Sequence, residues 1–339
     1  MAGRITDIAK KAGVSIATVS AVINEKGRIS PATRKKVLEV VRQLAYDTKG
    51  RKPAERGFRT NTIGLVMPGV WDWAGGFYHR AVTAASQTAA TFGYDCKILM
   101  LEEMQNRVID NFHKGRNQLG CDHIVFFCPK NEWTALLPGL TAWQVRTAVI
   151  RREAGSTGVA CITDDDNGGF RLGMEHLAGL GHRVIVLLRS FSGGIPARLQ
   201  AYQDTVREHG LVQDKGLVMA LSEEEFDLVP RIRELKKQGL TVTAVACSGD
   251  HLAVMAGQAL MREGFKVPAD ISILGYDDDP ICRSFYPNIT SVKVPVEEMM
   301  TAAFRAVIDP APELAGARQL ITFDNELVAR ESTGPAPVQ

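Results

Sequence analysis

Apolar residues recur at two different spacings along this chain, and the change falls close to residue 60. Before that point, apolar positions recur at helical spacing in short segments, which predicts helices. From Thr62 onward, apolar runs of strand length alternate with helical segments. Strands are expected at 62–68, 96–101, 122–129, 146–150, 158–163, 183–188, 243–248 and 271–276, and helices at 77–92, 102–119, 168–180, 198–209 and 250–263. This alternation predicts parallel strands covered by helices on both faces of a sheet. We therefore expect a small all-α unit at the N-terminus, followed by an α/β body.

Three short helices are expected in the N-terminal unit, over residues 7–12, 16–23 and 31–46. Thr6 is a suitable N-cap for the first and Ser15 for the second, because a hydroxyl oxygen accepts hydrogen bonds from the free N–H groups of a first turn. Gly13 separates these two helices, and Pro31 suits the first turn of the third. Two helices joined by a tight glycine turn and braced by a third form a helix-turn-helix unit. In such a unit the second helix enters the major groove of DNA by its N-terminal end.

The net charge of +2 is unevenly distributed along the chain. Residues 1–59 contain 14 Lys and Arg against 5 Asp and Glu, whereas the remainder contains 26 basic and 33 acidic residues. A basic unit attached to an acidic body indicates that only the N-terminal unit meets a polyanion.

Short side chains line the expected reading face of the second helix. Ile16, Ala17 and Ala21 are expected to face base edges, where they offer only apolar contact, such as to a thymine methyl group. Hydroxyl, amide and basic groups around them suit phosphates. The residues expected to bind DNA are Thr6, Ser15, Ile16, Ala17, Thr18, Ser20, Ala21, Asn24, Arg28, Arg34, Lys49 and Arg51. A small helical dimerisation cap is the alternative, but charge, caps and spacing agree better with DNA binding.

The segment ITDIAKKAGVSIATVSAVINEKGRISPATRKKVLEVVRQLAY resembles the DNA-binding head of LacI/GalR-type bacterial transcription regulators. The resemblance continues through TNTIGLVMP, LGHRVIVLL, VPADISILGYDDDP, PNITSV and ELVARES, and it covers nearly the whole chain. It implies a helix-turn-helix head followed by a periplasmic-binding-protein-like core of two doubly wound parallel-sheet lobes. The implied domains are a head over 1–46, a hinge over 47–60 and a core over 61–339, with lobe one at about 61–162 and 292–320 and lobe two at about 163–291 and 321–339.

The hinge over 47–60 departs from the family. In the family this stretch forms a short helix on operator DNA, and a leucine from it enters the minor groove. Here Glu55 stands at the expected leucine position, and Pro53 lies in the middle of the expected helix, where its ring and missing N–H disfavour helix. We predict that the hinge inserts no leucine. Phosphates are instead expected to contact Lys49, Arg51, Lys52 and Arg56. Ala21 also stands where a base-reading arginine is common, so the half-site is expected to differ from the usual family consensus.

A ligand site is expected in the body, because ligands of parallel sheets bind beyond the carboxyl ends of the strands. Aromatic, acidic and guanidinium side chains fall at these places, and together they suit a polyhydroxylated ligand. The residues expected to line this site are Trp71, Asp72, Phe77, Phe127, Asp165, Arg198, Asp250 and Asp277. The resemblance implies that Arg198 and Asp277 contact the effector, for which a sugar or sugar derivative is expected. Two positions depart from the family, since the aromatic pair expected near Ala74-Gly75 is missing and Gly249 replaces a common asparagine.

The run Asp164-Asp165-Asp166 leaves a second interpretation open, a metal-dependent enzyme acting on sugars or nucleotides, because hard cations bind carboxylate oxygens. Acidic residues after a strand more often cap the next helix, and the sequence contains no phosphate-binding loop, dinucleotide fingerprint or nucleophile elbow. We expect no enzyme activity, no metal and no cofactor. A solute-binding protein for transport is the other alternative, which the basic head and the lack of a signal peptide disfavour.

The compartment and the partners follow from the same features. The six cysteines form no C-x-x-C pair, and no apolar run reaches the ~20 residues needed to cross a bilayer. We therefore expect a cytoplasmic transcription regulator that acts as a repressor. Its expected partners are double-stranded operator DNA, a small sugar-like effector and a second copy of itself in a homodimer or tetramer, without any membrane.

Overall fold

The computed structural model describes residues 5–23, 29–30, 33, 36–37, 40, 60–68, 76–101, 119–129, 131–142, 144–151, 159–190, 196–221, 226–309 and 320–338. The chain divides into two units, Met1–Arg59 and Thr60–Gln339, and each is described by itself. Among the described residues, no helix is long and apolar enough to cross a membrane.

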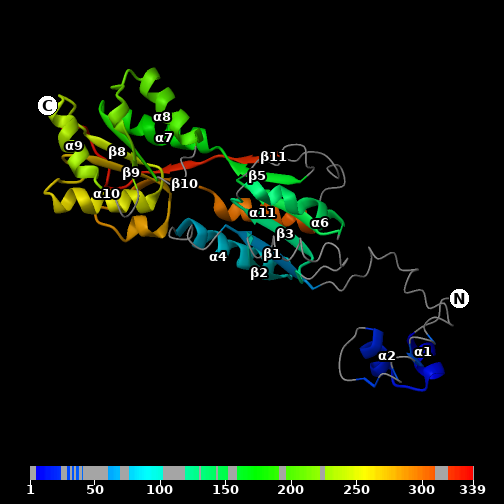
Figure 1. The fold of residues 1–339 in the computed structure, drawn as a ribbon. Helices are drawn as coiled ribbons and strands as arrows, with labels where there is room; N and C mark the ends of the chain where they lie inside the picture. Colours follow the sequence, from blue (N-terminus) through cyan, green and yellow to red (C-terminus); the bar gives the residue numbers. More distant parts are fainter. Residues whose placement is uncertain are drawn as a thin grey trace. The chain divides into compact units, whose positions relative to one another are not determined.

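The N-terminal unit contains helix α1 at Ile5–Ala12 and helix α2 at Ile16–Ile23, drawn in blue in Figure 1. Gly13 between them has a φ of +65°, a left-handed conformation that glycine adopts without strain. The core of this unit consists of Ala9, Ala12, Val19, Val22, Val37 and Val40. The predicted cap at Thr6 was wrong, because α1 begins at Ile5, two residues before the predicted start, and Thr6 lies within its first turn.

The first lobe of the body is built on a six-stranded parallel sheet with the order β11-β5-β4-β3-β1-β2. Its strands are β1 (Thr62–Met67), β2 (Asp95–Met100), β3 (His123–Phe127), β4 (Arg146–Ile150), β5 (Ala160–Asp164) and β11 (Leu320–Phe323). Helices α4 (Gly76–Thr91) and α11 (Val296–Ile308) cover one face. The 3₁₀ helix η2 (Asn131–Leu136) and helix α6 (Leu137–Ala142) cover the other.

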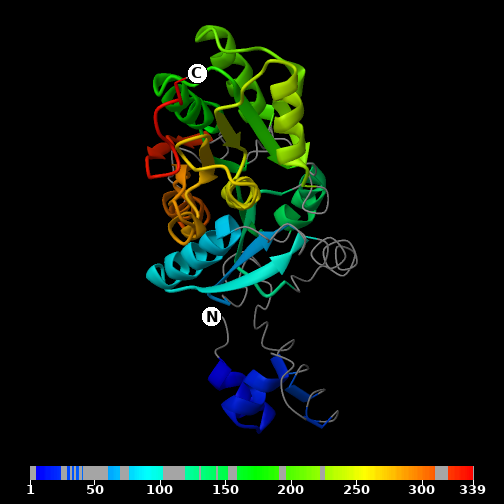
Figure 2. The ribbon, with the colours of Figure 1, turned by 90° about the vertical axis from the view of Figure 1, so that its left-hand side faces the viewer.

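The second lobe has its own six-stranded sheet with the order β12-β10-β9-β8-β6-β7. Its strands are β6 (Ile185–Ser190), β7 (Val218–Leu221), β8 (Ala244–Cys247), β9 (Ser272–Asp277), β10 (Thr290–Lys293) and the antiparallel β12 (Glu326–Val328). Helices α7 (Asp166–Gly179) and α8 (Pro196–Glu208) cover one face, and α9 (Leu228–Lys237) and α10 (Asp250–Arg262) cover the other (Figure 2). Short 3₁₀ helices lie at Lys215–Leu217 (η3) and Pro280–Arg283 (η4).

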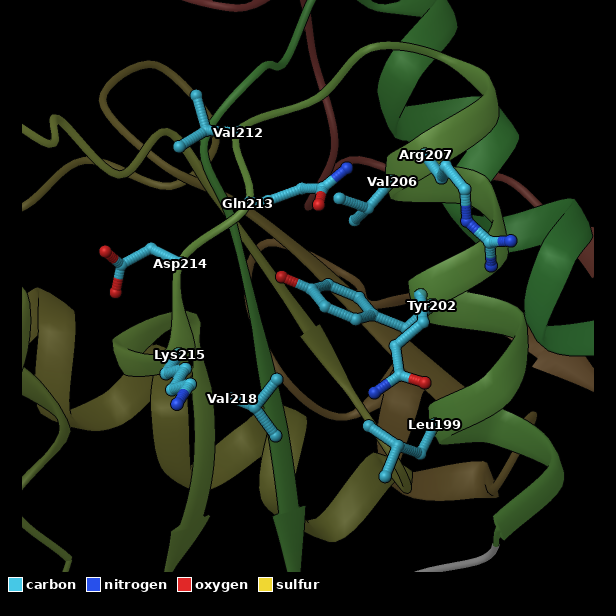
Figure 3. A pocket seen from close by; sticks show the side chains of 10 residues that line it. Leu199, Tyr202, Val206, Arg207, Val212, Gln213, Asp214, Lys215 and Val218 are labelled. Carbon is cyan, nitrogen blue, oxygen red and sulfur yellow. The ribbon is translucent and has the colours of Figure 1, made fainter.

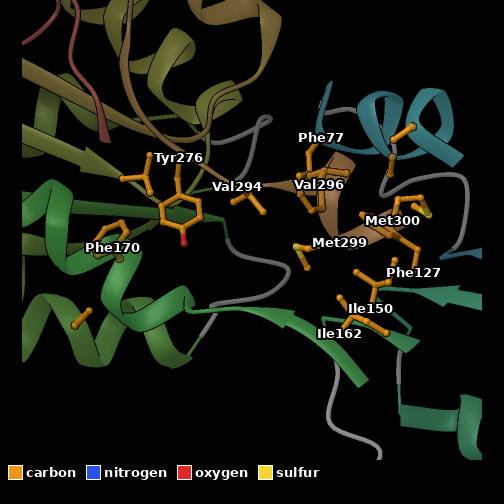
Figure 4. Packing of buried hydrophobic residues seen from close by; sticks show 14 of the residues in the cluster. Phe77, Phe127, Ile150, Ile162, Phe170, Tyr276, Val294, Val296, Met299 and Met300 are labelled. Carbon is orange, nitrogen blue, oxygen red and sulfur yellow. The ribbon is translucent and has the colours of Figure 1, made fainter. Parts of the chain in front are cut away.

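Alternate residues of the central strands enter different cores, as the period of two along a strand requires. In β6, Ile185 and Leu187 pack with α7 and α8, whereas Val186 and Leu188 pack on the opposite face with α9 and α10. The first of these cores continues from one lobe into the other (Figure 4). Its large side chains include Phe170 and Tyr276 of the second lobe and Phe77, Phe127 and Met299 of the first. Apolar side chains of the two lobes therefore pack together near the segments that connect one lobe to the other.

Within the described part, the chain crosses between the lobes between β5 and α7, between β10 and α11, and between β11 and β12. The last two crossings come a few residues after the expected boundaries at 292 and 320. Hydrogen bonding decides this placement, because β10 pairs with β9 in the second sheet and β11 pairs with β5 in the first. The elements absent from the sequence prediction are η2, α6, η3, β7, α9, η4, β10, α11, β11 and β12. Residues 102–118 of the expected helix over 102–119 lie outside the described residues.

Candidate functional site

The exposed start of α2 carries the predicted DNA-reading residues. Ser15 Oγ accepts a hydrogen bond from the backbone N–H of Thr18 at 3.0 Å, so this hydroxyl caps the helix as expected. Ile16 is 50% exposed and Ala17 is exposed beside it. An apolar side chain this exposed at a helix start is available for contact with a partner. The unit therefore presents a small apolar surface next to a capping hydroxyl.

The remaining DNA-binding candidates are only partly described. Thr6 lies in α1, and Ser20 and Ala21 lie in α2. The predicted residues Asn24, Arg28, Arg34, Lys49 and Arg51, together with the hinge residues Lys52, Pro53, Glu55 and Arg56, lie outside the described residues.

In the body, charged side chains from both lobes converge at the carboxyl ends of the strands. Arg151 follows β4 of the first lobe, and Asp164 and Asp166 lie where the chain crosses to the second lobe. Arg198 lies in the first turn of α8, and Asp277 ends β9. These five residues are called the interlobe cluster below.

Asp166 is the centre of the interlobe cluster. Its Oδ1 lies 2.9 Å from Nε of Arg198 and 2.7 Å from Nη2 of Arg151. Burial by itself raises the pKa of Asp166, but the two guanidinium groups outweigh burial and hold that pKa below its ordinary value. Asp166 is therefore a fixed anion that orients both arginines.

Each guanidinium group is also held by an aromatic ring and a further partner. Arg198 is 2% exposed, its Cζ lies 3.5 Å from the ring centre of Tyr276, and its Nη1 donates to the carbonyl oxygen of Ser248. Arg151 lies 5.0 Å from the ring centre of Phe77, and its Nε is 2.9 Å from Oδ1 of Asp164. Cation–π contact and ion pairing together fix these side chains in one orientation.

Asp277 differs from the other carboxylates of the interlobe cluster because it lacks a close partner. Its Oδ1 is 3.9 Å from Nη1 of Arg151 and 3.9 Å from Nη2 of Arg198, and it accepts no hydrogen bond from the described residues. Burial raises the pKa of Asp277 to about 6. Its φ of +106° and that of +57° at Arg151 are uncommon for residues with a side chain, and such conformations concentrate at functional sites.

The other predicted effector residues divide into two groups. Phe77 and Phe127 lie together, with ring centres 5.3 Å apart, on the first-lobe side of the cluster. Asp165 caps α7 through the N–H of Gly168 at 2.9 Å and is exposed, so it lies apart from the arginines. Trp71 and Asp72 lie outside the described residues.

Asp250 is turned into the second lobe. It is 2% exposed, and its two oxygens accept hydrogen bonds from the hydroxyl of Ser291 at 2.6 Å and the N–H of Asp279 at 2.7 Å. Asp250 therefore supports the turn after β9 that carries Asp277, although the sequence suggested direct ligand contact.

Three residues of this site, Arg151, Tyr276 and Asn325, were not singled out from the sequence, whereas Asp164 and Asp166 were named only as part of the acidic run. Arg151 directly follows a buried strand, which is the signal that identified the other candidates. Asn325 lies between β11 and β12 and donates to Oδ2 of Asp164 at 3.1 Å and to the Tyr276 hydroxyl at 2.8 Å. The run of three aspartates thus serves capping and ion pairing, and the described residues contain no group of His, Cys, Asp and Glu placed to hold a metal ion.

Comparison with known proteins agrees with this architecture. Residues 4–49 match the family of bacterial regulatory proteins named after lacI, and residues 174–333 match the periplasmic binding protein-like domain. The HTH-type transcriptional regulator DegA of Bacillus subtilis is 31% identical over 98% of both chains. GalR of Escherichia coli is 32% identical over 97% of this chain and 95% of its own. The chain belongs to the LacI family.

Solved structures of LacI-family regulators have the same fold. The transcriptional regulator CelR in complex with cellobiose is 25% identical, with a TM-score of 0.66 over 97% of this chain and 99% of its own. The lac repressor dimer bound to operator and an anti-inducer is 22% identical, with a TM-score of 0.64 over 98% and 100%. The predicted family, the helix-turn-helix head and the two-lobed core are confirmed. This LacI-family chain is a DNA-binding transcription regulator and not an enzyme.

A separate cavity lies in the second lobe of this LacI-family chain, away from the interlobe cluster (Figure 3). It measures about 610 Å³ and lies between α8 and the segment that leads into β7. Apolar side chains, including Leu199, Val206 and Val218, line it, and Arg207, Asp214 and Lys215 lie at its polar edge. No predicted effector residue lines this cavity.

Replacing Asp250 with asparagine is expected to remove a pH dependence from the stability of this LacI-family chain. Burial raises the pKa of Asp250 to about 8, above the ordinary value of 3.8 that the unfolded chain has. The folded state therefore keeps a proton that the unfolded state releases, so this contribution to stability is present below pH 4 and is lost as the pH rises to about 8. Denaturant unfolding of wild type and Asp250→Asn from pH 5 to 8.5 measures the difference, with Asp214→Asn as an exposed control. A constant difference between wild type and Asp250→Asn across this range contradicts the prediction.

Proposed function

We propose that this LacI-family regulator is a cytoplasmic repressor that acts as a homodimer or a dimer of dimers. The proposed effector is a sugar or sugar derivative bound between the lobes of the body. The observation that carries this proposal is the interlobe cluster, in which buried guanidinium and carboxylate groups from both lobes meet at the carboxyl ends of the strands. Ligands of open parallel sheets bind at this place.

Four residues of the interlobe region are proposed to contact the effector. Arg198 and Asp277 supply charged hydrogen-bonding groups, and Phe77 and Phe127 supply apolar area on the first-lobe side. The relative CelR was solved with cellobiose, and a further relative is named as the ribose operon repressor. Both names agree with a sugar-like effector for this chain.

The control of DNA binding follows from the two-lobed construction. An effector that binds one arrangement of the lobes more tightly than another shifts their equilibrium by that difference in affinity. In a dimer the arrangement of the bodies would set the spacing of the two heads, and the operator would share the two-fold symmetry of the protein.

The DNA contacts are assigned to α2 and its surroundings. Ile16, Ala17 and Ala21 are proposed to face bases, and Ser15, Thr18, Ser20 and Asn24 to contact phosphates. Thr6, Arg28 and Arg34 of the head and Lys49 and Arg51 of the hinge complete the proposed phosphate contacts. The test is a mobility-shift assay with DNA fragments from around the gene that encodes this protein, with and without sugars. No shift with any fragment, in either condition, contradicts the proposal.

Thymine methyl groups are expected to contribute to operator affinity, because the reading face is largely apolar. Removing one buried methyl contact costs about 0.8 kcal/mol, so uracil in place of a contacted thymine should weaken binding by roughly fourfold. The measurement is a titration of operators with single thymine-to-uracil changes. The control is the same change outside the half-sites. Unchanged affinity at every position contradicts apolar base reading.

A further inference from the structure

Arg80 of helix α4 in the first lobe reaches across to the second lobe. Its Nη1 donates to the carbonyl oxygen of Asp277 at 2.6 Å, at the end of β9. Its Nη2 donates to the carbonyl oxygen of Val294 at 3.0 Å, on the segment that leads from β10 to α11 (Figure 4). The Arg80 side chain is only 11% exposed, so water competes little for these bonds. Hydrogen bonds from a charged donor are also roughly twice as strong as neutral ones, so this contact holds the lobes together.

Glu297 fixes Arg80 within the first lobe. Nε of Arg80 donates to Oε1 of Glu297 at 3.1 Å, and Nη2 of Arg80 lies 2.7 Å from Oε2. Glu297 is in the first turn of α11, which packs beside α4 on the same face of the first sheet. Two parallel bonds to one carboxylate fix the plane of the guanidinium group. Nη1 is therefore directed toward the second lobe.

The start of α4 makes a second contact with the same turn of the second lobe. A Cβ atom on Gly76 would lie 2.1 Å from both carboxylate oxygens of Asp279, so only a glycine lets α4 approach this closely. Asp279 is 8% exposed, and its Oδ1 accepts a hydrogen bond from the N–H of Ile281 at 3.1 Å. This carboxylate therefore has little room to move away. The first lobe thus contacts the turn at both of its ends, Asp277 and Asp279.

The turn itself is fixed to the second lobe. The N–H of Asp278 donates to Oγ of Ser291 at 3.1 Å, and the Asp278 carboxylate pairs with Arg330. The N–H of Asp279 donates to Oδ2 of Asp250 at 2.7 Å. A turn held in this way moves with its lobe. Separation of the lobes would therefore break the bond from Arg80 and would not deform the turn.

We propose that Arg80 is an interlobe tie, a positioning residue that favours the lobe arrangement described above over a more open one. The tie acts on a main-chain carbonyl oxygen and on no effector atom. The inference therefore depends on neither the identity nor the place of the effector. It rests on the proposed function only in that the lobes have more than one arrangement. Loss of the tie should open the lobes in the absence of any sugar or DNA.

The thiol of Cys128 reports such an opening. Cys128 follows β3 at the carboxyl end of the first sheet and is partly exposed. Burial raises the pKa of Cys128 to about 12, and Arg151, Asp164 and Asp277 also act on it, so the thiol lies near the contact between the lobes. A protonated thiol alkylates slowly, because the thiolate is the nucleophile. Separation of the lobes would admit water, return the pKa toward its ordinary value and speed the reaction.

The experiment measures the rate at which iodoacetamide alkylates Cys128 in the full-length protein at pH 8, by mass spectrometry of the peptide that contains it. Arg80→Lys keeps the charge beside Glu297, but an ammonium group cannot reproduce the fork that also reaches the two carbonyl oxygens. The rate should rise at least roughly fivefold. Glu297→Gln is the matched control, because it weakens the ion pair within the first lobe and leaves the interlobe bond in place. It should stay within about twofold of wild type, since Glu297 is half exposed.

Gly76→Ala tests the contact between the lobes without changing Arg80. The added methyl group would press on the Asp279 carboxylate and force the lobes apart, so Cys128 should again react at least roughly fivefold faster. Alanine is a better helix former than glycine, so α4 is expected to persist. Gly179→Ala is the control, because a Cβ atom at that position of α7 would meet no atom within 4 Å.

Cys247 distinguishes opening of the lobes from loosening of the fold, because it is buried in the core of the second lobe. Its alkylation rate should not change in any variant. An unchanged Cys128 rate in both Arg80→Lys and Gly76→Ala overturns the inference. An equal rise in Glu297→Gln, or a parallel rise at Cys247 in both test variants, also overturns it. Operator binding is measured separately on the same preparations, because its absence contradicts the proposed function and leaves the Cys128 result intact.

Discussion

Replacing Ala17 with aspartate is expected to lower the affinity of this regulator for operator DNA by roughly 100-fold or more, through charge repulsion and a lost apolar contact with bases. Ala17 is exposed in the first turn of α2, beside the exposed Ile16. An acidic residue in a first turn is favourable to the helix, so the head is expected to remain folded. The loss would therefore fall on DNA binding and not on the fold.

The measurement is the mobility-shift titration of wild type and Ala17→Asp on the same operator fragment, with circular dichroism as a check of folding. Gln213→Asp is the control, because it makes the same change in net charge at an exposed position of the body. It should leave operator affinity within about twofold of wild type, since an exposed charge outside the DNA-binding head is screened by salt. Retained operator binding by folded Ala17→Asp would remove α2 from the interface.

Much of the fold could be predicted because the central strands are apolar on both faces. β4 was predicted at its observed bounds, and β1, β3 and β9 within two residues. The short strands β10 and β11 were not predicted, because TSVK and LITF are too brief to carry a pattern. Their assignment to a lobe depends on pairing with β9 and β5, which are distant in sequence, and hydrophobic periodicity does not encode such pairing.

For the site as well, the sequence predicts single residues at strand ends but not which of them pair with one another. Arg198 and Asp277 were predicted as site residues from the strand ends and the motif. In the structure Nη2 of Arg198 lies 3.9 Å from Oδ1 of Asp277. Asp165 was predicted to contact the effector, but the structure shows that Asp166 pairs with the arginines and Asp165 caps α7. A difference of one residue at the start of α7 decides which carboxylate takes which role. Arg151 was missed because its partners come from other strands, so its role depends on the order of strands in the sheet.

Replacing Arg198 with alanine is expected to have the largest effect in the body, on both effector response and stability. The change leaves Asp166 with one guanidinium partner and exposes Tyr276 to a cavity, since Arg198 now fills the space over that ring. Removing one member of a buried ion pair costs about 3–5 kcal/mol, and Arg151 should hold the loss near the lower end of that range by remaining paired with Asp166. Sugars that release wild type from operator should no longer do so.

Arg207→Ala gives the matched comparison on the same helix. Arg207 is exposed and pairs only with Asp204 among the described residues, so its loss should change stability by less than about 1 kcal/mol. Denaturant unfolding of the three proteins at pH 7 measures stability, and operator release by a sugar that binds wild type measures response. If Arg198→Ala and Arg207→Ala changed the free energy of unfolding and the operator release by similar amounts, the guanidinium of Arg198 would be no more important than a surface charge. Because the two arginines share a helix and a residue type, that result could not be attributed to helix propensity or to net charge, and the interlobe cluster would have to be abandoned as the effector site.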